Sequence, residues 1–111
     1  MSQLSGTKWV ATNKGATLLT DMEIERLLED LNGWSLVIHA GIRQLSRRFD
    51  TGNFNQTMTF VNSVAELAES HDHHPRLIVE YDSVTVIWWS HRLGGLHIND
   101  FIMAARTSEM A

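Results

Sequence analysis

Residues 54–90, FNQTMTFVNSVAELAESHDHHPRLIVEYDSVTVIWWS, decide the fold, because a helical pattern is followed directly by two strand patterns. In the first half, apolar residues recur at helical spacing: Phe54, Met58, Val61, Val64, Ala65 and Ala68. This spacing predicts a helix that ends near residue 69 or 71, since Pro75 cannot continue it. The second half contains two β-rich runs, residues 77–81 and 84–90, and Asp82-Ser83 between them predicts a tight hairpin.

The residues before this stretch predict another helix and another hairpin. Thr20-Asp-Met-Glu23 has the S/T-x-x-E form of a capping box, and apolar residues follow it at helical spacing as far as Leu31. Asn32-Gly33 tolerates a left-handed turn and should end that helix. Residues 34–40 and 42–49, on either side of Gly41, predict two paired strands. The first would place on one face Trp34, Leu36, Ile38 and Ala40.

A last helix is predicted from Ile98 to about Arg106, which gives the order α-β-β-α-β-β-α. Two hairpins can join into one four-stranded antiparallel sheet with helices packed on one face, so we expect an α+β fold. A chain of 111 residues suits one domain. Residues 1–16 show little periodicity and are expected to form an N-terminal arm, with the domain spanning 17–111.

The composition excludes several classes of protein. A net charge of −4 argues against a nucleic-acid or membrane surface, which would need a basic face. The absence of cysteine excludes disulfide scaffolds and thiolate metal sites. The first 15 residues are too polar for a signal peptide, and no apolar run approaches the roughly 20 residues that a membrane span needs. We therefore expect a soluble cytoplasmic protein.

Histidines are concentrated in one part of the chain: five of the six lie between positions 71 and 97. His73 and His74 fall where the long helix should end, and His91 ends a strand. Imidazoles around one pocket can supply an acid and a base together near neutral pH.

The same residues are also compatible with purely structural roles and with a metal site. Histidines at a helix C-terminus are favoured by the helix dipole and can cap carbonyls, and Asp100 would stabilise the start of the last helix without any catalysis. A metal site is a third possibility, because His71-x-His73-His74 with Asp72 could ligate zinc or iron, although the spacing matches no standard set.

The order Glu69-x3-His73-His74-Pro75, with His91 sixteen residues after the proline and Asp100 nine residues later, resembles the pterin-4a-carbinolamine dehydratases. The resemblance covers roughly residues 17 to 106. It implies a four-stranded sheet with helices on one side, assembled into homodimers or homotetramers. The implied reaction is dehydration of 4a-hydroxytetrahydropterin in tetrahydropterin recycling, without metal or organic cofactor. The implied partner is the pterin substrate, with no nucleic acid and no membrane.

The resemblance also implies roles for individual residues. His73 and His91 would transfer protons, His74 would bind and polarise the pterin, and Asp100 would organise the site or the last helix. The pterin site would also include Glu69, Asp72, Trp89, Ser90 and Arg92.

Two positions depart from the family pattern, and one alternative function remains. Leu77 stands where many relatives carry an aromatic residue, and His97 stands where the family often has Ser or Thr, so a weaker helix cap is expected there. His71 and His97 are expected to be surface or capping residues. The alternative is a non-catalytic binding protein on the same fold, acting as a transcriptional coactivator or an assembly factor.

Overall fold

Three helices and four strands follow one another in the predicted order in the structure, a computed structural model that describes residue 4 and residues 17–111. The predicted arm therefore lies, apart from Leu4, outside the described residues. The elements are α1 (Asp21–Glu29), β1 (Ser35–His39), β2 (Ile42–Asp50), α2 (Phe54–Ser70), β3 (Arg76–Glu80), β4 (Ser83–Trp88) and α3 (Ile98–Met110).

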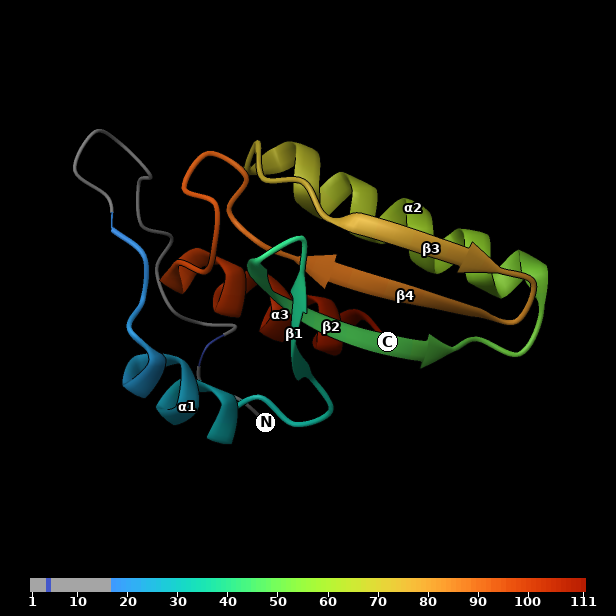
Figure 1. Cartoon of the computed structure of the whole chain (residues 1–111). Coiled ribbons are helices and arrows are strands. Elements are labelled where there is room, and N and C mark those ends of the chain that lie inside the picture. The colour runs from blue at the N-terminus through green and yellow to red at the C-terminus, as the bar shows by residue number, and fades with distance from the viewer. Residues whose placement is uncertain (1–3, 5–16) are drawn as a thin grey trace.

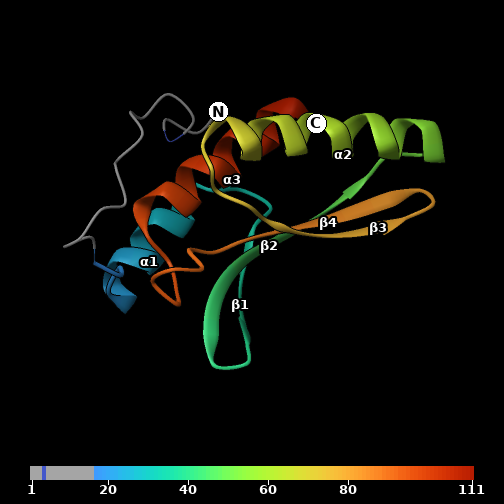
Figure 2. The same ribbon diagram turned by 90° about the horizontal axis from the view of Figure 1, so that it is seen from above.

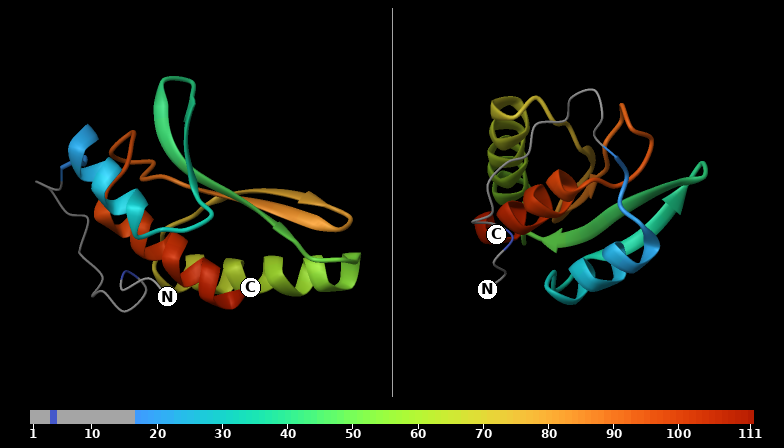
Figure 3. Two further views of the ribbon diagram at one scale, coloured as in Figure 1. Left: turned by 90° about the horizontal axis from the view of Figure 1, so that it is seen from below. Right: turned by 90° about the vertical axis from the view of Figure 1, so that its left-hand side faces the viewer.

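The four strands form one antiparallel sheet in the order β1-β2-β4-β3, so the two predicted hairpins join through β2 and β4. Helices α2 and α3 lie on one face of this sheet (Figures 1 and 2). Helix α1 lies beside the start of α3 (Figure 3), and the backbone N–H of Leu19 donates to the carbonyl of Leu96 at 2.8 Å. The predicted α+β fold is confirmed.

The core lies between the sheet and the helices. Its largest completely buried side chains include Trp88 of β4, Leu45 of β2 and Phe101 of α3. Burying such side chains supplies about 1.5–3 kcal/mol each. Since α3 carries both core residues and the N-terminal carboxylate Asp100, core packing also fixes the position of that carboxylate.

The prediction for the first strand was partly wrong. Trp34 is buried as expected, but it precedes β1, and Ala40 lies in the turn at a positive φ of 52°. Leu36 and Ile38 are exposed, because none of the helices α1 to α3, which the described part of the chain forms, covers the outer end of the β1–β2 hairpin (Figure 2). Alternation along a strand shows which residues share a face, but not whether that face is covered.

No helix among the described residues has the length and apolar character needed to cross a membrane.

Candidate active site

The C-terminus of α2 positions the first two histidines. Asp72 takes a left-handed conformation (φ 48°), which an Asp tolerates better than most side chains. Its backbone N–H donates to the carbonyl of Glu69 at 3.3 Å, and that of His73 donates to the carbonyl of Ala68 at 3.1 Å. This is the hydrogen-bond pattern of a Schellman motif. The helix end therefore turns the chain sharply at His73, and Pro75 directs it into β3.

A tight loop after β4 positions the third histidine. Ser90 and Gly95 form an isolated antiparallel bridge, and the carbonyl of Ser90 accepts the backbone N–H groups of Leu93 (3.2 Å) and Gly94 (2.9 Å). Gly94 has a φ of 72°, which favours glycine at this point of the turn. The loop holds the backbone on both sides of His91 and presents its side chain next to the end of α2.

These two segments together enclose a cleft of about 320 Å³. Its lining consists of Asp72, His73, His74, Ser90, His91, Arg92 and Leu93. The structure thus brings together six residues predicted from the sequence. Leu93 was missed, because an apolar residue in a glycine-rich turn carries no signal beyond its place in the loop.

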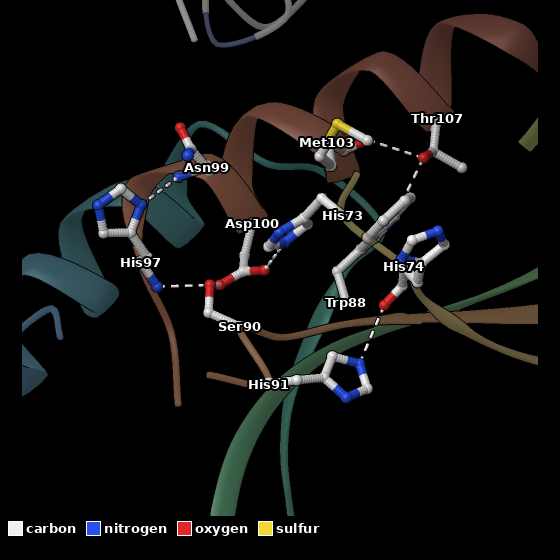
Figure 4. A network of polar contacts seen from close by, with 10 residues as sticks. All are labelled: His73, His74, Trp88, Ser90, His91, His97, Asn99, Asp100, Met103 and Thr107. Atoms are coloured by element: carbon white, nitrogen blue, oxygen red, sulfur yellow. Dashed lines mark hydrogen bonds and ion pairs between the residues drawn. The ribbon is translucent and has the colours of Figure 1, made fainter. Parts of the chain in front are cut away.

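Asp100 lies behind the cleft, and its carboxylate is completely buried. One oxygen, Oδ1, accepts from His73 Nε2 at 2.6 Å, and the other, Oδ2, accepts from Ser90 Oγ at 2.8 Å and from the backbone N–H of His97 at 2.9 Å (Figure 4). A buried carboxylate is tolerated only when donors replace its water shell, and three donors do so here. The Asp100 side chain is not exposed to the cleft, and it contacts two residues that line it, His73 and Ser90.

The hydrogen bonds fix which ring nitrogen carries the proton in each cleft histidine. Nε2 of His73 donates to Asp100, Nε2 of His74 donates to Glu69 Oε1 at 2.5 Å, and Nε2 of His91 donates to the carbonyl of His74 at 3.0 Å. An imidazole that donates through Nε2 takes up its second proton at Nδ1. All three rings therefore donate through Nε2 to an acceptor of the protein.

Two neighbouring tryptophans orient two of the rings. Trp88 stacks on His73 with ring centroids 5.8 Å apart, and its indole N–H donates to Thr107 Oγ1 of α3 at 3.1 Å. Trp89 stacks on His91 with centroids 4.1 Å apart. Sequence reasoning missed the parts of Trp88 and Thr107 here, since only the packed structure brings α3 against the end of β4.

Some predicted site residues lie outside the cleft lining. Glu69 is largely exposed and contacts His74, which is about half exposed, and Trp89 stacks on His91. His71 caps the end of α2, and its Nε2 accepts from Arg106 at 2.9 Å. His97 caps the start of α3. Both were predicted to be surface or capping residues; both lie at helix caps, and His97 is buried.

The His71-Asp72-His73-His74 segment does not converge on one point. Among residue 4 and residues 17–111, no three His, Cys, Asp or Glu side chains are grouped so that they could hold a metal ion. The strained helix end explains this, because it turns His71 towards Arg106 and His73 towards Asp100.

Comparisons with known proteins agree on one family. The model of the family described as "Pterin 4 alpha carbinolamine dehydratase" matches residues 17–110. A protein of Chlorobium luteolum is 46% identical over 99% of this chain and 96% of its own length, and one of Marinobacter nauticus is 46% identical over 99% of both chains. Both carry the name "Putative pterin-4-alpha-carbinolamine dehydratase".

Two solved structures are similar in fold. One, a transcriptional coactivator/pterin dehydratase from Brucella melitensis, has a TM-score of 0.78 and 29% identity over 86% of this chain and 99% of that chain. The other is a pterin dehydratase-like protein described as a RuBisCO assembly factor in the alpha-carboxysome. It has a TM-score of 0.60 and 25% identity over 72% of this chain and 90% of that chain.

Proposed function

The chain belongs to the pterin 4 alpha carbinolamine dehydratase family, and on that premise we propose that it dehydrates a 4a-hydroxytetrahydropterin to the quinonoid dihydropterin and water. In this elimination the N5–H bond and the C4a–O bond break, and the electron pair of N5–H forms the C4a=N5 double bond. The departing hydroxyl takes up a proton and leaves as water. The reaction needs one group that removes a proton and another that supplies one.

His73 and His91 are the proposed proton-transfer pair. Both line the cleft, and each is held in place by a hydrogen bond from its Nε2 to an acceptor of the protein. The Asp100 carboxylate beside His73 compensates the positive charge of a protonated ring, as the carboxylate does in a Ser-His-Asp triad. We therefore assign His73 as the acid that protonates the leaving hydroxyl. His91 is then the base that removes the N5 proton.

His74 is the proposed substrate-binding histidine. Its ring lies on the rim of the cleft, where Glu69 holds Nε2 and leaves Nδ1 to contact a polar ring atom of the pterin. Asp72 and Arg92 also line the cleft and supply an acceptor and a donor for the edge of a pterin. Ser90 lines the cleft as well, and its hydroxyl oxygen can accept from the substrate while its hydrogen is donated to Asp100.

The observation that carries the proposal is the convergence of His73, His74 and His91 on one cleft, with a separate acceptor for Nε2 of each. Histidines that served only to cap a helix would not need to meet a third ring from another element. A general acid or a general base typically raises the reaction rate by about 10²–10⁴-fold.

Single histidine variants test the assignment of roles. Following the decay of 4a-hydroxytetrahydropterin by stopped flow, we expect His73→Ala and His91→Ala to lower kcat by about 10²–10⁴-fold each. His74→Ala should mainly raise KM. His39→Ala is the matched control, since His39 is exposed at the end of β1 far along the chain from the cleft. Equal kcat values for the His73→Ala and His39→Ala variants would contradict the assignment.

A non-catalytic binding role is the second candidate, and the names of the two similar structures favour it. It predicts that the protein binds a macromolecular partner equally well when the cleft is inactivated. Pull-down from the native host with wild type and the His73→Ala variant separates the two functions. A partner retained by both, together with no pterin dehydration by wild type, would replace the enzymatic proposal.

We further propose a cytoplasmic homodimer or homotetramer. β3 is an edge strand with Ile78 and Val79 each about 40% exposed, and an uncovered edge of this kind is suited to pairing with another chain. Light scattering after size-exclusion chromatography tests the oligomeric state, and a monomer at micromolar concentration would contradict it.

A further inference from the structure

Helix α3 begins with a histidine in a position that Ser, Thr, Asp or Asn usually occupies. His97 has extended backbone angles (φ −122°, ψ 162°), and its Nδ1 accepts the backbone N–H of Asn99 at 3.1 Å. In return, the backbone N–H of His97 donates to Asp100. The imidazole thus forms the capping box that the sequence led us to expect would be weaker.

The difference from a hydroxyl cap is that imidazole titrates near neutral pH. Because Nδ1 accepts the N–H of Asn99, the neutral ring of His97 must carry its proton on Nε2. A second proton can be added only to Nδ1, and a protonated Nδ1 is a donor that faces another donor. Protonation of His97 is therefore incompatible with the cap.

The surroundings of His97 keep it neutral at neutral pH. Burial is the main cause that lowers its pKa below the usual value of 6.5; the negative charge of Asp100 opposes this shift, and a positive charge on His73 adds to it. From α1, Glu23 and Arg26 line with His97 a cavity of about 410 Å³. This cavity brings solvent close to the ring.

The cap is coupled to the cleft through one carboxylate. Asp100 Oδ2 accepts the N–H of His97, while Oδ1 of the same side chain holds His73 Nε2. Any change in the first turn of α3 moves both oxygens together, because the carboxylate is a rigid plane.

We propose that His97 is a positioning residue: its neutral imidazole holds the first turn of α3 so that Asp100 stays against His73, and protonation in mild acid releases that hold. The activity readouts of this inference rest on the proposed dehydratase function. The catalytic residues remain His73 and His91, which His97 does not touch.

The test compares wild type with His97→Ser, which keeps a side-chain acceptor that does not titrate. Both proteins carry the same cleft histidines, so the ratio of their kcat values isolates the titration of His97. We expect a constant ratio above pH 7 and a fall of about threefold or more in the wild-type-to-variant ratio between pH 7 and 5. A ratio that stays constant from pH 8 to pH 5 would overturn the proposal.

His97→Ala removes the acceptor at every pH. We expect it to lower kcat by about tenfold at pH 7.5 with little change in KM, because a small displacement of a proton-transfer group slows the chemical step. The His97→Ser variant should recover most of that loss. Equal kcat values for wild type and His97→Ala would also overturn the proposal.

A readout without substrate separates this inference from the proposed function. In ¹⁵N NMR spectra at pH 7.5, the imidazole signals of His73 should shift in His97→Ala and return to their wild-type positions in His97→Ser. If wild type dehydrates no pterin but these shifts are seen, the positioning role stands and the proposed function fails. Unchanged His73 signals in His97→Ala would overturn the positioning role whatever the activity.

Discussion

Two helices of this protein begin with the same reciprocal cap, yet only one of them is connected to the histidine cleft. At α1, the backbone N–H of Thr20 donates to Glu23 at 2.9 Å, and at α3 the backbone N–H of His97 donates to Asp100 at the same distance. Thr20 and Glu23 are exposed, whereas His97 and Asp100 are buried.

Burial decides what the capping carboxylate can do besides capping. Glu23 is exposed to solvent, and the hydrogen bonds from Thr20 lower the pKa of its carboxyl. The Asp100 side chain is completely buried, and His73, 27 residues away in the chain, and Ser90 provide its remaining donors. A cap inside the core thereby becomes the group that orients a cleft histidine.

Neutralising each capping carboxylate in turn tests whether only Asp100 contributes to catalysis. Asp100→Asn replaces one acceptor oxygen with an N–H₂ group, which cannot accept from His73, Ser90 or His97. We expect kcat to fall by about 10²–10⁴-fold, the usual contribution of a general acid or base, since the corresponding change from Asp to Asn in a Ser-His-Asp triad costs about 10⁴-fold. Glu23→Gln is the matched control and should leave kcat unchanged. A similar kcat for both variants would show that Asp100 is only a cap.

The second contact between α3 and His73 passes through Trp88. Thr107→Val keeps the shape of a buried side chain but removes the acceptor for the indole N–H of Trp88. An unsatisfied buried donor costs about 1–3 kcal/mol of the free energy of unfolding. Urea denaturation should show that loss, and kcat should fall as well, because Trp88 stacks on His73. A loss of stability with unchanged kcat would limit the role of Trp88 to packing.

The exposed cap should affect stability alone. Thr20→Ala removes the hydroxyl that accepts the N–H of Glu23, and such changes cost about 0.5–2 kcal/mol. Thermal melting should detect this loss while kcat at a temperature well below the melting point stays at the wild-type value. If kcat fell as far as it does in His97→Ala, the two caps would not differ in function.

The smallest expected effect concerns pH. The pKa of Glu23 in the folded protein lies below its ordinary value of 4.5, so its contribution to stability is present above that pH and is lost as the pH falls through the folded pKa. The melting temperature of wild type should therefore exceed that of Glu23→Gln near neutral pH and converge with it in acid. A difference that is independent of pH would mean that the charge of Glu23 is irrelevant.

Most of the fold could be predicted because it follows from local patterns. The helical spacing after Phe54, the capping box at Thr20 and the hairpin residues Asp82-Ser83 each report on a few neighbouring residues. The end of α2 was also predictable, since Pro75 forbids a longer helix. These features need no knowledge of distant contacts.

The candidate site could be predicted only as a set of residues. Spacing and family resemblance indicated His73, His91 and Asp100. They did not indicate that one oxygen of Asp100 accepts from His73 while the other accepts from the backbone N–H of His97. Ser90 was expected at the pterin; it lines the cleft, and its hydroxyl also donates to Asp100, a contact that the sequence did not indicate. A weaker cap was expected at His97, and the structure shows the capping box formed, with Nδ1 of a buried imidazole accepting from Asn99. Burial and tertiary contacts decide these points, and a local pattern does not contain them.

Proton transfer by His73 and His91 is tested most directly by single-turnover stopped flow with 4a-hydroxytetrahydropterin, comparing wild type with the His73→Ala plus His91→Ala double variant. We expect wild type to accelerate the loss of the 4a-hydroxyl and the double variant to leave the decay at its uncatalysed rate. Wild type that gives no acceleration, or a double variant with full activity, would contradict it.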